Sequence, residues 1–117
     1  MRPEERDLAY LWDMREASLD VIEFIKGVTF ERFSKEKMLR YAVERRMEVI
    51  GEAARHVSET FQREHPQIPW ARIIGQRNIL AHEYGEILIE RVWRTANENI
   101  PELFELLKQM IPAAEDE

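Results

Sequence analysis

The stretch that decides the fold is Lys35–Thr60, KEKMLRYAVERRMEVIGEAARHVSET. Apolar residues recur in it at helical spacing, at Leu39, Ala42, Val43, Ile50, Ala53, Ala54 and Val57. This period predicts one long α-helix with a buried face, and long helices are typical of a bundle. Ser34 is the expected N-cap. Gly51 predicts a close approach by another helix, because a mid-helix glycine otherwise costs about 1 kcal/mol relative to alanine.

A second long helix is predicted upstream, from about Pro3 to Lys26, with Gly27 as its stop. Its apolar residues occupy more than one face: Leu8, Leu11, Trp12, Leu19, Ile22 and Ile25 on one, and Tyr10, Met14, Ala17, Val21 and Phe24 on the next. A helix that is apolar on two faces needs more than one neighbour. We therefore expect part of it to face another subunit.

The clearest break is His65–Trp70, where two prolines interrupt the helical pattern. A shorter helix is expected from about residue 69 to residue 84 and should end at Gly85. The last helix should begin near Glu86 and kink or break near Pro101. The sequence thus predicts an all-α antiparallel bundle with four main helices.

Composition limits the classes of function. The 117 residues suit a single domain, 1–117, with a frayed acidic tail at 112–117. The net charge is −6, whereas nucleic-acid-binding proteins are usually basic, so any action on RNA needs a local site or a partner protein. Without cysteine there can be no disulfide scaffold and no thiolate metal site. No signal peptide or membrane-spanning run is recognisable, and a cytoplasmic location is expected.

The residues with chemical potential are concentrated between Arg77 and Tyr84, RNILAHEY. On a helix, Arg77 and Tyr84 share one face and Asn78 and His82 share the neighbouring one, whereas Arg77 and His82 stand about 140° apart. A straight helix cannot easily aim both at one phosphate. Either the helix unwinds near His82, or a second copy of the segment completes the site across a dimer axis.

These side chains suit phosphodiester chemistry. Arg77 offers a planar, permanently charged fork for phosphate oxygens, His82 can accept or donate a proton near neutral pH, and Asn78 can orient either group. The scheme requires no metal. Spacing alone favours an ordinary structural role: Arg77 as a surface ion pair, His82 bonded to a carbonyl, and Tyr84 packed with its hydroxyl at the rim.

Taken together, features along most of the chain resemble the HepT-like group of the HEPN superfamily, toxins encoded beside a MntA-type minimal nucleotidyltransferase. The resemblance extends from about Asp7 to Leu107. It rests on Asp7, Leu8, Trp12–Met14, Arg40–Arg45, Glu48–Ala54, Ile68–Trp70, Ile74–Asn78, His82, Tyr84, Val92 and Trp93. The family's R-x4-H-x-Y motif is present intact.

The resemblance implies a function for this segment. Arg77 and His82, with Asn78, would be the ribonuclease residues of a homodimer that cuts RNA by attack of the 2′-hydroxyl and leaves a cyclic phosphate. This ribonuclease and the nucleotidyltransferase encoded beside it would form a type II toxin–antitoxin system. The partner nucleotidyltransferase would transfer AMP from ATP to Tyr84 and thereby silence the toxin, because the added negative charge lies on the face of Arg77.

Other residues support weaker expectations. Arg91 and Arg94 either extend a basic rim for RNA or the partner, or form an ordinary exposed face. Glu48 and Glu52 are expected in interhelical ion pairs with arginines such as Arg45 or Arg77 rather than at a metal.

Two histidines, His56 and His65, should be solvated, and the three tryptophans should lie in the core or an interface. The alternative function is a non-catalytic helical module that binds the nucleotidyltransferase or its nucleotide. The acidic net charge favours this alternative, whereas the intact Arg77, His82 and Tyr84 argue against it.

Overall fold

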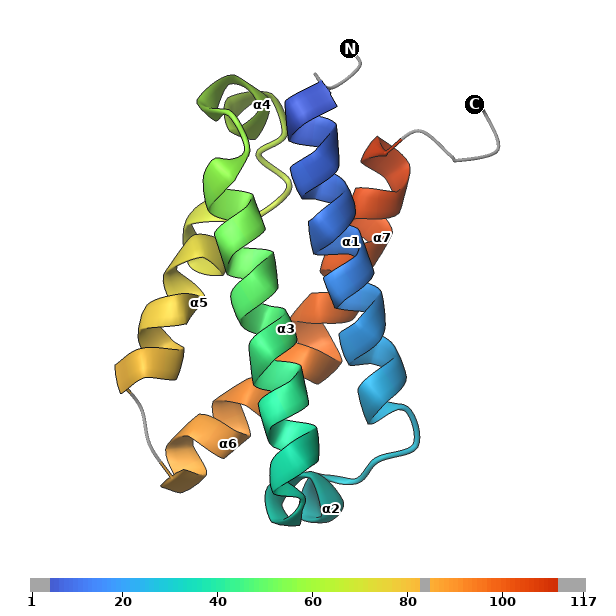
Figure 1. The fold of residues 1–117 in the computed structure, drawn as a ribbon, viewed down its shortest axis with the longest axis vertical. Coiled ribbons are helices and arrows are strands. Elements are labelled where there is room, and N and C mark those ends of the chain that lie inside the picture. Colours follow the sequence, from blue (N-terminus) through green and yellow to red (C-terminus); the bar gives the residue numbers. More distant parts are fainter. Residues whose placement is uncertain (1–4, 83–84, 112–117) are drawn as a thin grey trace.

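A computed structural model describes residues 5–82 and 85–111, which fold into helices joined by short connections (Figure 1). The helices are α1 (Glu5–Ile25), α2 (Phe30–Lys35), α3 (Lys37–His56), α4 (Glu59–Glu64), α5 (Trp70–His82), α6 (Gly85–Arg94), the π-helical segment η1 (Thr95–Asn99) and α7 (Ile100–Met110). The predicted all-α class is confirmed. Within the described ranges, no helix has the length and apolar character needed to cross a membrane.

The helices form a bundle around α3 (Figure 1). Helix α1 lies antiparallel beside α3, α5 packs against α3 as well, and α7 packs against α1. The continuous path from α6 through η1 to α7 crosses the bundle obliquely. The fully buried side chains at the centre come from α1, α3, α6 and α7 and include Leu11, Met14, Val21, Val43, Ile50, Val92 and Leu107. The predicted bundle is therefore confirmed.

Two contacts fix α5 against α3. A Cβ atom built on Gly51 would lie 3.1 Å from the backbone oxygen of Ile73, so the two helices approach as closely as the glycine predicted. Further along the same contact, Gln76 donates a hydrogen bond from Nε2 to the backbone oxygen of Met47 at 3.1 Å. The chain therefore holds α5 firmly along its buried face.

The start of α3 differs from the prediction. Ser34 is not its N-cap, because Ser34 lies inside the short helix α2 and donates to the backbone oxygen of Glu31 at 2.9 Å. Thr29 caps α2 instead and accepts a hydrogen bond from the backbone N–H of Arg32 at 3.1 Å. The cap residue of α3, Glu36, makes no side-chain capping bond. Of these two adjacent helices, only α2 has a hydroxyl side chain as its N-cap.

The end of α3 also differs. The predicted helix to Thr60 stops at His56, and Ser58 begins the separate helix α4 by accepting from the backbone N–H of Phe61 at 3.2 Å. Ser58 in turn donates its backbone N–H and its hydroxyl to the carboxylate of Asp7, at 2.8 and 2.6 Å. A long-range contact with α1 thus breaks a helix whose apolar pattern alone would continue.

The interruption near Pro101 takes the form of a π-helical turn. The backbone N–H of Ile100 bonds to the oxygen of Thr95, and Pro101 falls in the first turn of α7, where its missing N–H is tolerated. The side chain of Asn97 donates to the backbone oxygen of Trp93 at 2.8 Å. The predicted break is confirmed, and it begins ahead of the proline.

Two glycines were predicted to end helices, and the structure confirms this for one of them. Gly27 has φ +73° and ends α1 as expected, because this conformation favours glycine. Gly85 was expected to end the shorter helix, but it is the first residue of α6, while α5 ends at His82. The residues between them lie outside the described ranges, as does the predicted tail at 112–117.

The aromatic residues divide between core and surface. Trp70 is buried and donates from Nε1 to the backbone oxygen of His65 at 3.0 Å. Trp93 is half-buried against Phe33, whereas Trp12 is 40% exposed on α1. His65 is not the solvated residue that was expected, because its Nδ1 donates to the backbone oxygen of Phe61 at 3.0 Å and its ring stacks on the same residue.

Candidate active site

Helix α5 carries three of the four predicted motif residues, Arg77, Asn78 and His82. Its backbone is helical from Trp70 to His82, so the helix does not unwind ahead of His82. The separation of about 140° between Arg77 and His82 therefore applies to their backbone positions. The side chains of residues 77–82 and the whole of Tyr84 lie outside what the structure describes.

The described part of α5 supplies a fixed base for this segment. Trp70, Ile73 and Gln76 are all buried, and Gln76 is hydrogen-bonded to α3 directly before Arg77 in the chain. Side chains on regular, packed helices are placed more reproducibly than those on loops. The motif therefore follows directly after residues of α5 that are packed against α3.

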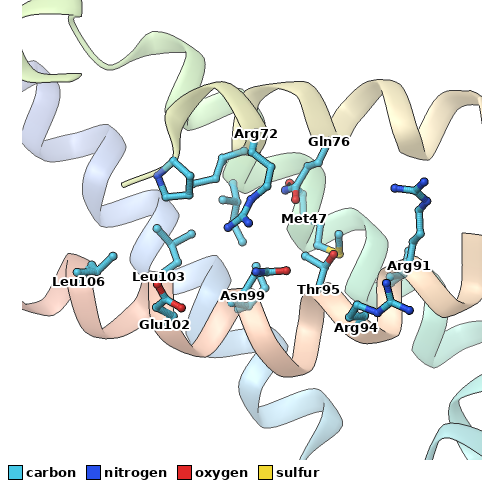
Figure 2. Close-up of a pocket in the computed structure, with 15 residues that line it drawn as sticks. Met47, Arg72, Gln76, Arg91, Arg94, Thr95, Asn99, Glu102, Leu103 and Leu106 are labelled. Atoms are coloured by element: carbon cyan, nitrogen blue, oxygen red, sulfur yellow. Dashed lines mark hydrogen bonds between the residues drawn. The ribbon is translucent and has the colours of Figure 1, made fainter. Parts of the chain in front are cut away.

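A cavity of about 220 Å³ lies between α5 and the layer formed by α6, η1 and α7 (Figure 2). Its apolar lining includes Met47, Ile50, Ile73, Val92, Leu103 and Leu106. Arg72 and Gln76 extend toward it from α5, and Arg91 and Arg94 rise from the opposite wall (Figure 2). Thr95 and Asn99 of the π-helical segment complete its polar rim.

The charge of this cavity is opposite to that of the whole protein. Three guanidinium groups line it, those of Arg72, Arg91 and Arg94, against one carboxylate, that of Glu102, while the chain carries a net charge of −6. The structure places Arg91 and Arg94 in one wall of this cavity, across from α5. Arginine side chains in a cavity lining suit an anionic ligand.

Sequence reasoning did not single out Arg72, Gln76 or Asn99 as site residues. Arg72 and Gln76 are four apart and so share a face of α5, but nothing local shows which face meets α6. Asn99 reaches the cavity from within the π-helical turn. These residues become a group only once both α5 and the α6–η1–α7 segment have folded around the cavity.

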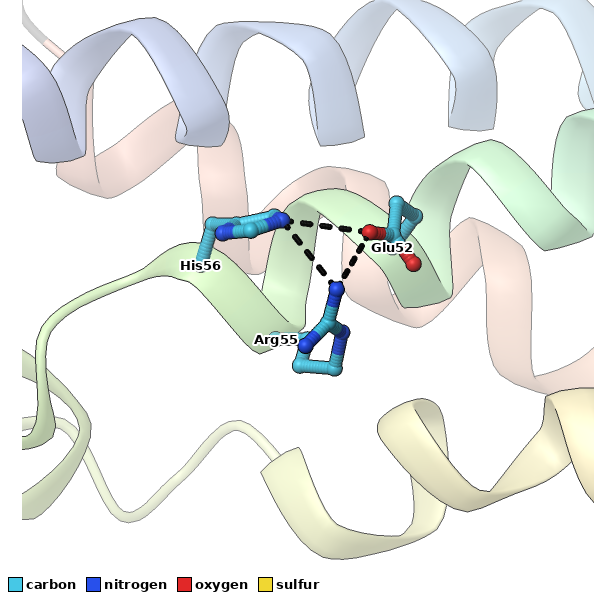
Figure 3. Close-up of polar contacts among 3 residues, drawn as sticks. All are labelled: Glu52, Arg55 and His56. Carbon is cyan, nitrogen blue, oxygen red and sulfur yellow. Dashed lines mark hydrogen bonds and ion pairs between the residues drawn. The ribbon is translucent and has the colours of Figure 1, made fainter.

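A separate polar cluster lies on the surface of α3 (Figure 3). Glu52 accepts from Arg55 at 2.7 Å and lies 3.1 Å from Nε2 of His56, and these hydrogen bonds hold the pKa of the Glu52 carboxyl below its usual value. The His56 ring also stacks on Tyr10, with centroids 5.2 Å apart. His56 is therefore exposed but has partners.

The remaining expectations for this helix are tested in part. Glu52 pairs inside α3 in the contacts just given, and its expected partner Arg77 has a side chain outside the described ranges.

On the same helix, burial raises the pKa of the Glu44 carboxyl above its usual value. The nearby Arg40 lowers this pKa in part, and Glu48 raises it further. Across the described residues, no three acidic or histidine side chains are arranged to hold a metal ion.

Comparison with known proteins places the chain among ribonucleases. Residues 14–110 match the HepT-like family, described as ribonuclease HepT-like. A candidate RNase from Methanocaldococcus jannaschii is 41% identical over 85% of this chain and 92% of its own length. A candidate ribonuclease HepT from Thermococcus cleftensis is 38% identical over 86% and 94%. No solved structure matches the chain.

The match to the family runs from the middle of α1 to the end of α7 and includes all of α5 and the cavity opposite it. It agrees with the resemblance inferred from Arg77, His82 and Tyr84 and with the observed all-helical bundle. The chain belongs to the HepT-like ribonuclease family.

Proposed function

We propose that the protein is a metal-independent endoribonuclease and the cytoplasmic toxin of a type II toxin–antitoxin pair. The observation that carries this proposal is the family match over residues 14–110 together with the intact motif of Arg77, Asn78, His82 and Tyr84. The firm attachment of α5 to α3 supports it, because a preorganised site needs a rigid scaffold.

The proposed reaction is an internal transesterification. His82 takes the proton from a ribose 2′-hydroxyl, whose oxygen attacks the adjacent phosphorus while the bond to the 5′-oxygen breaks. Arg77 stabilises the negative charge that develops on the phosphoryl oxygens, and Asn78 orients these groups. The leaving 5′-oxygen takes up a proton, and the products carry a 2′,3′-cyclic phosphate and a 5′-hydroxyl.

The geometry of α5 supports a site shared by two subunits. Because the helix stays regular to His82, one copy presents Arg77 and His82 about 140° apart. A two-fold axis beside the two α5 helices would let Arg77 of one copy meet His82 of the other. Such a dimer would contain two composite sites, each with Arg77 from one copy and His82 from the other.

In this proposal Tyr84 is the switch. A MntA-type nucleotidyltransferase, acting as antitoxin, transfers AMP from ATP to the Tyr84 hydroxyl and releases pyrophosphate. The phosphodiester that forms is negatively charged and bulky. It would lie close to Arg77 and exclude an RNA phosphate by charge and by size.

The test treats the purified protein with the nucleotidyltransferase encoded beside it, ATP and Mg²⁺, removes the transferase, and measures RNA cleavage in EDTA. Untreated wild type is expected to cut RNA, and treated wild type to gain AMP on the peptide containing Tyr84 and to lose cleavage. Tyr84→Phe should take up no AMP and keep the activity it had before treatment. If neither sample cuts RNA while the transferase still binds, the alternative of a non-catalytic partner-binding module is correct.

A further inference from the structure

We infer that the cavity between α5 and the α6–η1–α7 layer binds one nucleotide unit, with its base inside and its phosphate at the arginine rim. The inference deepens the proposed function, on which it rests: the nucleotide is part of the RNA strand cut at Arg77 and His82. At about 220 Å³ the cavity lies below the roughly 300 Å³ at which sites for drug-sized ligands begin. A cavity of this size can hold a single base and little more.

The inside of the cavity suits a flat ring with polar edges. Ile73 of α5 and Val92 of α6 contribute aliphatic surface from opposite walls, against which the faces of a base can pack. Gln76 uses its Nε2 on the backbone oxygen of Met47, which leaves the amide oxygen as an acceptor for an N–H of a base edge. Asn99 offers a second amide at the rim.

The mouth of the cavity suits the phosphate. Arg72 extends toward the cavity from α5 and Arg94 from the opposite wall, and guanidinium groups bind phosphate oxygens through paired hydrogen bonds (Figure 2). The lining contains one carboxylate, that of Glu102. This site would also explain how an acidic protein attracts RNA.

The cavity and the proposed active site share helix α5. Arg72 and Arg77 are five residues apart on it, about 7.5 Å along the axis and about 140° around it, and Gln76 directly precedes Arg77. An RNA strand with one nucleotide in the cavity therefore passes partly around α5 to reach Arg77. The π-helical segment on the opposite wall is consistent with a role in binding, because such segments are frequent at functional sites.

The test measures binding of a fluorescein-labelled RNA 12-mer of mixed sequence to full-length His82→Ala, which cannot cut the probe under the proposed mechanism. Adding Arg72→Gln should weaken binding about tenfold, the loss expected for one charge-assisted hydrogen bond. It should also reduce the slope of log affinity against log salt by about 0.7, the value for one phosphate contact on a single strand. Adding Thr95→Phe, which fills the cavity and keeps all three arginines, should weaken binding without that change in slope.

The matched control is Arg63→Gln, an exposed arginine on α4, away from the cavity. Equal losses for Arg63→Gln and Arg72→Gln would show general charge attraction and overturn the inference, as would unchanged binding in both cavity variants. The melting temperature of each variant shows whether a loss of binding comes from misfolding. If Thr95→Phe unfolds, Arg72→Gln still tests the inference, because Arg72 is exposed and its substitution should leave the fold intact. Competition by free ribonucleoside monophosphates against the 12-mer shows whether an unlinked nucleotide also enters the cavity.

Cleavage kinetics separate this inference from the proposed function. With His82 intact, Arg72→Gln and Thr95→Phe should raise KM about tenfold and leave kcat nearly unchanged, because they affect binding of the strand and not the chemical step. If cleavage depends on His82 but KM is unaltered, the cavity inference fails alone. If His82→Ala cuts RNA as fast as wild type, the proposed function fails first.

Discussion

His82→Ala is expected to lower the single-turnover rate of RNA cleavage by about 10²- to 10⁴-fold, the range for removing a general acid–base group. Alanine can neither take the proton from the 2′-hydroxyl nor protonate the leaving oxygen. His82 ends α5, and alanine favours helix, so the bundle should keep its melting temperature. The measurement is the first-order rate of product formation from a labelled RNA, in EDTA, with enzyme in excess.

The matched control is His56→Gln, which removes an exposed histidine from α3. This substitution removes the contact between His56 and Glu52, and neither residue takes part in the proposed chemistry. The variant should therefore cut RNA at the rate of wild type. A rate for His82→Ala within twofold of wild type, at full RNA saturation, would remove His82 from the reaction.

Asp7→Ala is expected to lower the free energy of unfolding by about 3 kcal/mol, because hydrogen bonds to charged groups contribute about 1.5–3 kcal/mol. The carboxylate is only 4% exposed and accepts both the backbone N–H and the hydroxyl of Ser58. Without it, Ser58 has unsatisfied donors next to the start of α4. The measurement is urea denaturation followed by circular dichroism at 222 nm.

The control is Asp13→Ala, an exposed carboxylate on the same helix, whose substitution should change stability by less than about 0.5 kcal/mol. Equal small losses in both variants would contradict the structural role of Asp7. Asp7 contributes to the family resemblance, and its contacts give it a role in joining α1 to α4 rather than in chemistry.

The bundle could be predicted because its main determinants are local. The apolar period of Lys37–His56, the positive φ available to Gly27 and the prolines around Ile68 act within a few residues of where they occur. A close approach of another helix to Gly51 could also be predicted, although not that this helix is α5, because a glycine inside an apolar helical pattern lowers helix stability unless it lets a neighbouring backbone approach.

Long-range contacts account for what the sequence did not reveal. The apolar pattern continues past His56, and α3 ends there because Asp7, about fifty residues earlier, holds Ser58. The cavity arises in the same way: Arg72 on α5 and Arg94 on α6 meet only because the last helices cross back over the bundle. Periodicity shows which residues are buried, but it does not show which surfaces face each other.

The central claim, a ribonuclease site shared between two copies of α5, is tested most directly by mixing subunits of two inactive variants. Arg77→Ala and His82→Ala are each purified, mixed, unfolded and refolded together, and RNA cleavage is compared with that of each variant treated alone. A heterodimer has one composite site with both residues intact and one lacking both.

Random pairing makes half of the dimers mixed, each with one working site of two, so the mixture should recover about a quarter of wild-type activity. The products should carry 2′,3′-cyclic phosphates. A mixture that stays as inactive as its two components, although heterodimers are present by native mass spectrometry, would contradict the shared site.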